Sequence, residues 1–86
     1  MSFEELIHID EFSSTPKYRQ LANSIIEGIQ KKVIKKGDIL PSINEVSFQF
    51  YISRITVEKG YNYLKSIGII DSVRGKGFFI NVDTIP

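Results

Sequence analysis

Apolar residues in the middle of the chain recur at the spacing of an α-helix. Ile43, Val46 and Phe50 are three and four residues apart, which places them on one face of a helix with 3.6 residues per turn. Ser42 precedes this run, and Glu45 follows Ser42 by three residues. This spacing is typical of a capping box, in which each side chain bonds to the backbone NH of the other residue. The pattern predicts a helix from Ile43 to Phe50.

A second helical pattern follows after a very short interval. Val57, Tyr61 and Leu64 recur at positions i, i+4 and i+7 behind Ser53, a second N-cap residue, and Gly68 is expected to end the helix. Two helices joined by so short a turn predict a helix-turn-helix, whose second helix can lie in the major groove of DNA with its first residues against base edges. These first residues are Ser53, Arg54, Ile55 and Thr56.

The strongest helical pattern precedes these two helices. Thr15 is predicted to be the N-cap, with Pro16 at the first helical position, where the missing NH of proline is not needed. The lysines near the predicted end, before Gly37, fit either a solvated helix end or contacts to phosphate; they are Lys31, Lys32, Lys35 and Lys36. The helix has a wide apolar face formed by Tyr18, Leu21, Ala22, Ile25, Ile26, Ile29 and Val33.

The segments around this helix show no helical period. Residues 1 to 14 alternate apolar and polar positions only briefly, in IHID, which predicts no more than a short extended segment. We interpret them as an arm that lies on the domain. Residues 37 to 41, GDILP, form a short connection from which Ile39 and Leu40 are expected to enter the core.

The C-terminal part predicts a β-hairpin. β-Branched and aromatic residues flank RGKG, so strands are expected over residues 69 to 73 and 78 to 82, with Gly75 and Gly77 at the tip. Such a hairpin is marginally stable alone and must pack on the helices. The order of elements predicts a winged helix-turn-helix, mainly α with a small hairpin. It would occupy residues 15 to 82, between the arm and a linker or tail at residues 83 to 86.

Composition and charge narrow the class of protein. The 86 residues allow one domain with a modest core, and the absence of cysteine excludes disulfides and thiolate metal sites. No apolar run could span a membrane, and the acidic N-terminus is unlike a signal peptide, so we expect a cytoplasmic protein. Residues 16 to 86 carry all eleven basic residues against six acidic ones, a net charge of +5 that favours an anionic partner.

Few residues of the chain could support catalysis or hold a metal ion. His8 is the only histidine and no cysteine accompanies it, so neither a metal site nor a general base is expected. The sequence therefore predicts a protein that is not an enzyme and needs no cofactor. Seven aromatic residues could stack on single-stranded bases, but the spacing of most of them favours a place in the core. The seven are Phe48, Phe50, Tyr51, Tyr61, Tyr63, Phe78 and Phe79.

Four segments in register resemble a known family. PKYRQLANSI opens the first helix, KKGDILPSINEV leads into the second, ISRITVEKGYNYLKSIGII covers the third, and RGKGFF forms the hairpin tip. With these motifs, residues 16 to 82 resemble the N-terminal DNA-binding domain of the GntR family of bacterial transcription regulators. The resemblance implies a winged helix-turn-helix that binds operator DNA.

The resemblance also implies which residues touch DNA. Ser42 would contact a backbone phosphate, and Ser53 and Thr56 would contact phosphate or base. Arg54 would bind a base edge, commonly guanine. The tip of the wing would lie at the minor groove through Arg74, Gly75 and Lys76.

Three further positions of this surface have their own interpretation. Lys59 lies one helical turn beyond Arg54, where it either meets phosphate or is simply solvated. The family usually has arginine where this chain has Asn44, and often arginine where it has Glu58. Both changes remove positive charge, but Asn can pair with adenine and Glu can accept from cytosine N4. We therefore expect them to redirect the sequence preference.

The resemblance implies partners as well. The family places a ligand-sensing and dimerising domain after the wing, and such a domain lies outside this chain. The chain would then be either one domain of a longer regulator or a short family branch with a small helical tail. The implied partners are a double-stranded operator half-site, a second copy held through that C-terminal domain, and a small-molecule effector bound there.

An alternative function of another class remains open. The lost charges at Asn44 and Glu58 are compatible with a winged-helix module that binds a protein and not DNA. The two hypotheses differ in their response to salt, because contacts to phosphate release counterions and a protein interface does so much less.

Overall fold

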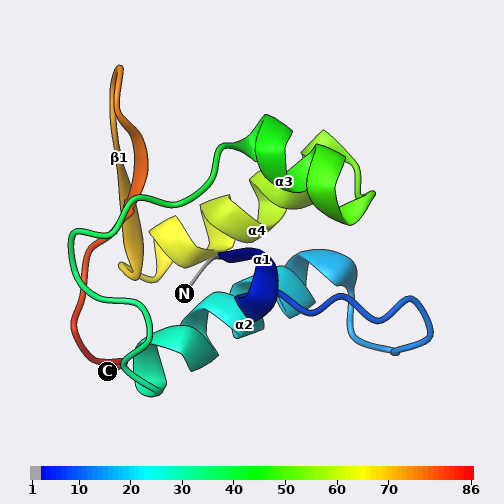
Figure 1. Cartoon of the computed structure of the whole chain (residues 1–86), viewed down its shortest axis with the longest axis horizontal. Helices are drawn as coiled ribbons and strands as arrows, with labels where there is room; N and C mark the ends of the chain where they lie inside the picture. Colours follow the sequence, from blue (N-terminus) through cyan, green and yellow to red (C-terminus); the bar gives the residue numbers. More distant parts are fainter. Residues whose placement is uncertain (1–2) are drawn as a thin grey trace.

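Helices α2 (Lys17–Gln30) and α4 (Arg54–Ser66) cross at the centre of the fold (Figure 1). Gly60 of α4 is buried at the crossing, where a Cβ atom would lie 2.9 Å from the Tyr18 carbonyl oxygen and 3.1 Å from a Leu21 methyl group. Only glycine therefore lets the two backbones approach so closely. This computed structural model describes residues 3–86, and its other elements are α1 (Phe3–Leu6), α3 (Ile43–Phe50), β1 (Ile70–Val73) and β2 (Gly77–Ile80).

The hydrophobic core surrounds this crossing. It takes side chains from α2, α3, α4, both strands and the segments between them, so the hairpin is packed on the helices as it must be to be stable. The order of three main helices and a hairpin confirms the predicted winged helix-turn-helix. The buried apolar residues are Ile7, Leu21, Ala22, Ile25, Ile29, Ile34, Leu40, Val46, Ile52, Val57, Tyr61, Leu64, Ile69, Ile70 and Ile80.

The helix-turn-helix is fixed by caps on both of its helices. Ser42 Oγ accepts from the Glu45 NH at 3.1 Å and the Ser42 NH donates to Glu45 Oε1 at 3.1 Å, which confirms the predicted capping box. Ser53 caps α4, because its Oγ accepts from the Thr56 NH at 3.0 Å. Tyr51 ends α3 in the left-handed conformation, with φ of 55°. This residue turns the chain from one helix into the next.

The wing is an antiparallel hairpin in which Ile70 pairs with Ile80 and Val73 pairs with Gly77. Its strands are shorter than the predicted ones and begin or end up to two residues away. The Lys76 NH donates to the Val73 carbonyl at 2.9 Å, and Gly75 has φ of 84°, as the third residue of a type II turn requires. The predicted glycine turn at the tip is therefore confirmed.

The connection between α2 and α3 joins the wing as a third, irregular strand. Ile39 forms a β-bridge with Phe79, and the Leu40 NH donates to the Phe78 carbonyl at 2.9 Å. Leu40 is buried as predicted, but the prediction for Ile39 was wrong, because its side chain is 57% exposed. Neighbouring residues of an extended segment point to opposite sides, so only one of the two enters the core.

The predicted start of α2 was wrong. Pro16, with φ of −55° and ψ of 146°, is the N-cap, and no side chain caps this helix. Thr15 instead lies before the cap, where its carbonyl accepts from Gln20 Nε2 at 2.8 Å. The fixed φ of proline suits an extended residue at this position as well as a helical one.

The predicted end of α2 was also wrong, because the helix ends at Gln30 and none of the four lysines lies in its last turn. Lys32 takes a left-handed conformation with φ of 62°, and the NH groups of Val33 and Ile34 both donate to the Gly28 carbonyl. A Cβ atom at Gly28 would lie 2.6 Å from the Ile34 side chain. The missing side chain thus lets Ile34 fold back, which leaves Val33 38% exposed and not on the predicted apolar face.

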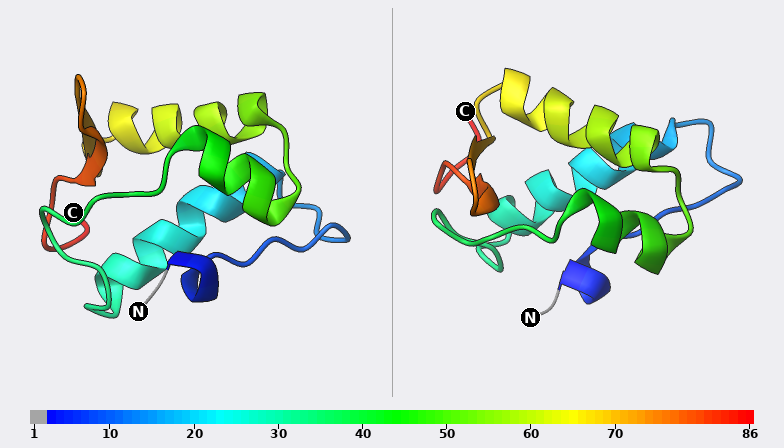
Figure 2. Two further views of the ribbon diagram at one scale, coloured as in Figure 1. Left: turned by 45° about the horizontal axis from the view of Figure 1, so that its top comes forward. Right: turned by 90° about the horizontal axis from the view of Figure 1, so that it is seen from above.

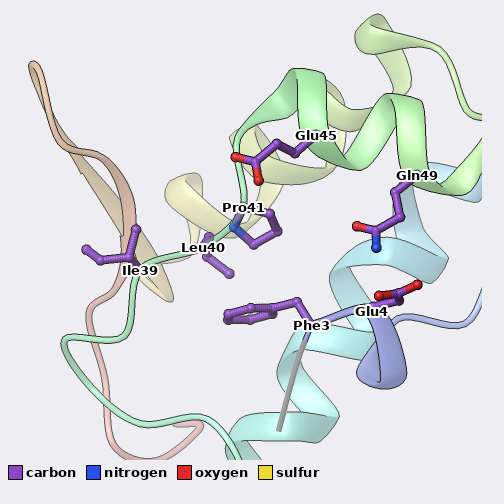
Figure 3. A pocket seen from close by; sticks show the side chains of 7 residues that line it. All are labelled: Phe3, Glu4, Ile39, Leu40, Pro41, Glu45 and Gln49. Carbon is purple, nitrogen blue, oxygen red and sulfur yellow. The ribbon is translucent and has the colours of Figure 1, made fainter.

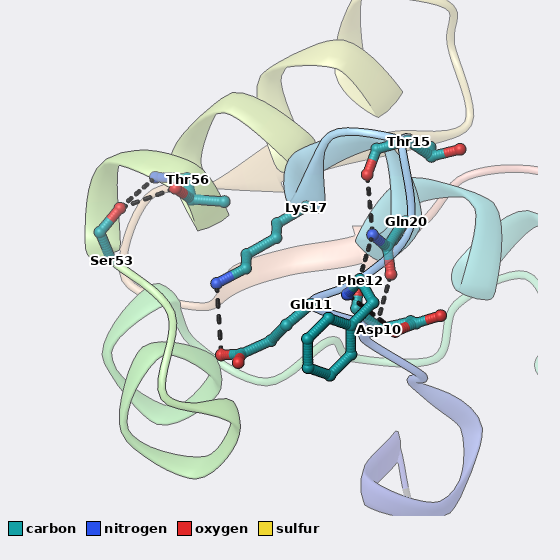
Figure 4. Close-up of polar contacts among 8 residues, drawn as sticks. All are labelled: Asp10, Glu11, Phe12, Thr15, Lys17, Gln20, Ser53 and Thr56. Atoms are coloured by element: carbon teal, nitrogen blue, oxygen red, sulfur yellow. Dashed lines mark hydrogen bonds and ion pairs between the residues drawn. The ribbon is translucent and has the colours of Figure 1, made fainter.

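The N-terminal arm lies on α2. It contains one helical turn, α1, which the sequence did not predict, followed by Ile7, which is buried. The His8 NH donates to the buried Ser24 Oγ at 3.2 Å, while Gln20 donates to the Asp10 carbonyl at 3.0 Å (Figure 4). An ion pair between Glu11 and Lys17 spans 3.6 Å at the start of α2. These contacts place Asp10 and Glu11 of the arm beside the N-terminal end of α2, which carries Lys17.

Most of the seven aromatic residues are buried or half-buried, as predicted, but two are exposed. Phe48 and Tyr51, on the last turn of α3 and at its C-cap, are 86% and 90% exposed. In Figure 2 the turn between α3 and α4 lies at the end of the molecule that also holds residues 10 to 15 of the arm, opposite the wing. Within residues 3–86 no helix is long and apolar enough to cross a membrane, and no three metal-ligating side chains come together.

We predict that Gly60→Ala destabilises the protein by about 1–3 kcal/mol, although alanine favours helices by up to about 1 kcal/mol. The added methyl group would meet a backbone oxygen of α2, which cannot rotate away as a side chain would. Urea unfolding would measure the change, with exposed Asn62→Ala on the same helix as the control. Equal stability of Gly60→Ala and wild type would show that the crossing does not need glycine.

Candidate nucleic-acid interface

Helix α4 has one buried face and one exposed face. Val57, Gly60, Tyr61 and Leu64 are buried against the core. The exposed face begins directly behind the Ser53 cap. Its residues are Arg54, Ile55, Glu58, Lys59 and Asn62.

Arg54 is the first residue of α4 and is exposed. Glu58 follows it by four residues, the spacing of a helical ion pair, yet among residues 3–86 no carboxylate lies within ion-pair distance of Arg54. The guanidinium therefore keeps its planar set of five NH donors for an external acceptor.

Ser53 and Thr56 are brought together at the start of the same helix, with their hydroxyl oxygens 2.7 Å apart (Figure 4). Either hydroxyl can be the donor in this contact. Two hydroxyl protons are present and their mutual bond uses one, so one proton remains for a phosphate or base acceptor. The pair can thus cap the helix and donate outward at once.

The start of α3 carries the other predicted helix contacts. Ser42 uses its hydroxyl oxygen for the cap, and Asn44 is exposed in the first turn with an amide that both donates and accepts. The Glu45 carboxylate already lies at the positive end of the helix dipole through its bond from the Ser42 NH. Asn44 therefore remains the exposed polar group at this helix start.

Two cation–π contacts connect α4 to the start of α2. The Lys59 ammonium lies 4.5 Å from the centre of the Tyr18 ring, and the Arg19 guanidinium lies 4.4 Å from the centre of the Tyr63 ring. Lys59 is therefore neither freely solvated nor committed to an ion pair. The ring holds the ammonium in place while leaving its outward NH donors free.

The tip of the wing carries Arg74, Gly75 and Lys76, all of them exposed. No carboxylate within residues 3–86 forms an ion pair with either cation. Lys65 near the end of α4 donates to Ser72 Oγ of β1 at 2.9 Å, which braces the wing against the helix. The tip thus extends two free cations beyond a braced stem.

Tyr61 holds these parts in their relative positions. Its hydroxyl donates to the Pro41 carbonyl at 2.7 Å, directly before the Ser42 cap, and its ring contacts Phe78 of the wing edge-on at 4.9 Å between centroids. Burial raises the pKa of Tyr61, and the nearby Glu45 carboxylate raises it further. The phenol therefore remains a donor at physiological pH.

The four lysines near the end of α2 have separate environments. Lys31 pairs with Glu27, whose pKa is lowered first by the hydrogen bond from Lys31 and then by its charge. Lys32 donates to the Asp83 carbonyl at 3.0 Å, while Lys35 and Lys36 are exposed. Lys31 and Lys32 thus contact groups of the protein itself, which favours a structural role over contact with phosphate for these two lysines.

An open depression of about 440 Å³ lies between Phe3 of α1, the residues before α3, and α3 itself (Figure 3). The Phe3 ring points toward Leu40 and Pro41, and Glu45 and Gln49 line the helical side. None of the predicted DNA contacts lines it. The candidate interface therefore lies outside this depression.

Sequence reasoning missed one feature of this surface. Tyr18 was placed on the apolar face of α2 by its spacing, but its half-buried ring supports Lys59. Ile55, which was expected among the first residues of the second helix, is 76% exposed beside Arg54.

A helix-turn-helix with an exposed second helix and a cationic wing defines the class of winged-helix domains. The chain matches the model of bacterial regulatory proteins of the gntR family over residues 17–80. The transcriptional repressor YtrA of Bacillus subtilis is 40% identical over 76 residues, which make up 88% of this chain and 58% of that repressor.

Solved structures agree with this match. YtrA of Sulfolobus acidocaldarius, a GntR-family transcription factor, has a TM-score of 0.82 and 42% identity, over 88% of this chain and 80% of that one. The AraR DNA-binding domain in complex with operator ORE1 has a TM-score of 0.74 and 32% identity, over 85% of this chain and 99% of that one.

The chain therefore belongs to the GntR family of bacterial regulatory proteins, which confirms the resemblance drawn from its motifs. It spans 58% of the length of the Bacillus subtilis repressor.

We predict that Tyr61→Phe lowers the free energy of unfolding by about 1 kcal/mol, because the Pro41 carbonyl loses its donor while the ring contact to Phe78 remains. Chemical denaturation would measure this loss. Tyr63→Phe removes the same atom from a half-buried ring and serves as the control. Identical losses in the two variants would contradict a special role for the bond to Pro41.

Proposed function

We propose that this domain binds double-stranded DNA sequence-specifically, as the DNA-binding part of a bacterial GntR-like transcription regulator. The observation that carries the proposal is the exposed face of α4, which begins with the unpaired Arg54 directly behind a helix cap. In this arrangement α4 enters the major groove and the wing lies at the minor groove. The related AraR DNA-binding domain was solved in complex with operator ORE1, which supports DNA binding by this chain.

The residues then divide by the part of DNA that they contact. Arg54 donates in bidentate fashion to a guanine edge, while Asn44 and Glu58 pair with adenine and with cytosine N4. The contacts to phosphate fix the register and carry no sequence information. Those contacts come from Ser42, from the Ser53 and Thr56 pair, and from Lys59, and the wing adds Arg74, Gly75 and Lys76 at the minor groove.

The chain is organised, in this proposal, as an arm at residues 1 to 14, the DNA-binding domain at residues 15 to 82, and the beginning of a linker or tail at residues 83 to 86. Each domain reads one half-site, and a C-terminal domain outside this chain joins two copies and binds a small-molecule effector. Such a regulator acts in the cytoplasm by binding and not by catalysis. Pairing two domains raises the affinity far above that of one.

We predict that binding to a pool of random-core duplexes, followed by fluorescence anisotropy, falls steeply as salt increases. Arg54→Ala should weaken binding to the enriched sequences by about 10- to 100-fold, equivalent to about 1–3 kcal/mol, because a bidentate guanine contact is lost. Lys36→Ala is the matched control, since it removes one exposed charge from the connection after α2.

The same measurement separates the two hypotheses of function. A folded domain that shows no salt-sensitive binding to any duplex would contradict the proposal and favour a module that binds protein. Equal losses from Arg54→Ala and Lys36→Ala would show that Arg54 contributes only net charge. Its role in reading a base would then be wrong.

We further predict that Asn44→Arg and Glu58→Arg each strengthen binding and steepen the salt slope by about one unit, because each adds a cation to the proposed footprint. Each variant should also select a different base at one position of the enriched site. Asn62→Arg adds one positive charge about one turn beyond Glu58 on α4, and it should change neither the salt slope nor the base preference to the same degree. Unchanged base preference in both test variants would contradict the assignment of Asn44 and Glu58 as base readers.

A further inference from the structure

Ile55 is an apolar side chain on the exposed face of the helix that would read DNA. It lies in the first turn of α4 and is 76% exposed. Its neighbours on that face are charged: Arg54 precedes it, and Glu58 and Lys59 follow at i+3 and i+4. Arg54 and Lys59 on either side favour an anionic partner, so an apolar group is held where a polyanion would approach.

Packing does not account for this side chain. The residues that do pack nearby are Ile52 and Val57, which are 6% and 0% exposed and fix the rotation of α4 about its axis. Ile55 is neither part of the core nor among the partly buried residues that pack against it. Rotating it inward would expose Val57 and Tyr61, so the folded protein keeps it outside.

We infer that Ile55 recognises the 5-methyl group of a thymine in the major groove, beside the base read by Arg54. This inference rests on the proposed function and adds a base that the polar residues do not read. Thymine is the only one of the four bases that presents a methyl group there, and an apolar side chain discriminates it by contact. Cytosine, with hydrogen at the same position, offers less apolar surface.

The geometry of the helix places this thymine close to the Arg54 contact. Consecutive Cα atoms lie about 3.8 Å apart whatever the tilt of the helix, and stacked bases lie about 3.4 Å apart. Arg54 and Ile55 are consecutive in the turn that meets the base edges first. They therefore read the same base pair step, and a guanine contacted by Arg54 should have a thymine at an adjacent position on either strand.

The experiment replaces thymines one at a time by deoxyuridine, which removes only the methyl group. A duplex enriched by the wild-type protein is the starting sequence, and anisotropy gives the Kd of each replacement. At one position next to the guanine read by Arg54, the wild type should lose about 3- to 5-fold in affinity, the factor for one methyl group taken out of water. Ile55→Ala should bind the thymine and deoxyuridine duplexes equally.

Two further variants test the contact itself. Ile55→Val keeps an apolar branched side chain and should retain most of the preference for thymine. Asn62→Ala, on the same exposed face, should keep the full preference. Because Ile55 is exposed, the variants should fold like the wild type, which circular dichroism would check.

Each other outcome has a definite meaning. An equal loss for wild type and Ile55→Ala on deoxyuridine would assign the methyl contact to another residue and overturn the inference. The absence of any deoxyuridine effect would overturn it as well, while salt-sensitive binding would leave the proposed function intact. If the wild type shows no salt-sensitive binding to DNA at all, both the inference on Ile55 and the proposed function are refuted.

Discussion

The relative positions of both helices of the helix-turn-helix and of the wing depend on one buried residue, Tyr61. Its hydroxyl reaches the carbonyl that precedes α3, and its ring meets Phe78 of β2. A single side chain of α4 thus contacts both the residue before the first turn of α3 and strand β2 of the wing, and it fixes their positions relative to α4. Because burial keeps this phenol protonated, the hydrogen bond does not change with pH in the physiological range.

Local signals in the sequence were sufficient for the helix-turn-helix. The Ser42 and Glu45 capping box, the Ser53 cap and the glycine turn of the wing depend on residues at most a few positions apart. Backbone chemistry at these positions allows few alternatives, so α3 was predicted with its observed bounds and the winged fold followed from the order of elements. The candidate contacts at the helix starts could be identified for the same reason.

Features that depend on distant contacts could not be predicted. The end of α2 follows from Ile34 folding over Gly28, and the exposure of Ile39 follows from its pairing with Phe79, which lies forty residues away in sequence. In the candidate site, Tyr18 under Lys59 comes from another helix. The spacing of apolar residues shows which face of a helix or strand is apolar. It does not show which charged side chain of another element will contact that face. Spacing also did not show that Phe48 and Tyr51, near the turn, are the exposed members of the aromatic set.

The wing is attached at its base from several directions. The connection after α2 exchanges backbone hydrogen bonds with β2, and Lys32 holds the Asp83 carbonyl beyond it, whereas the tip carries glycines with positive φ at residues 75 and 77. The two ends of the hairpin therefore differ in how many other segments contact them. Residues 81 to 86 leave the domain from the anchored base, so their starting direction is set by the same contacts that hold β2 and not by the position of the tip.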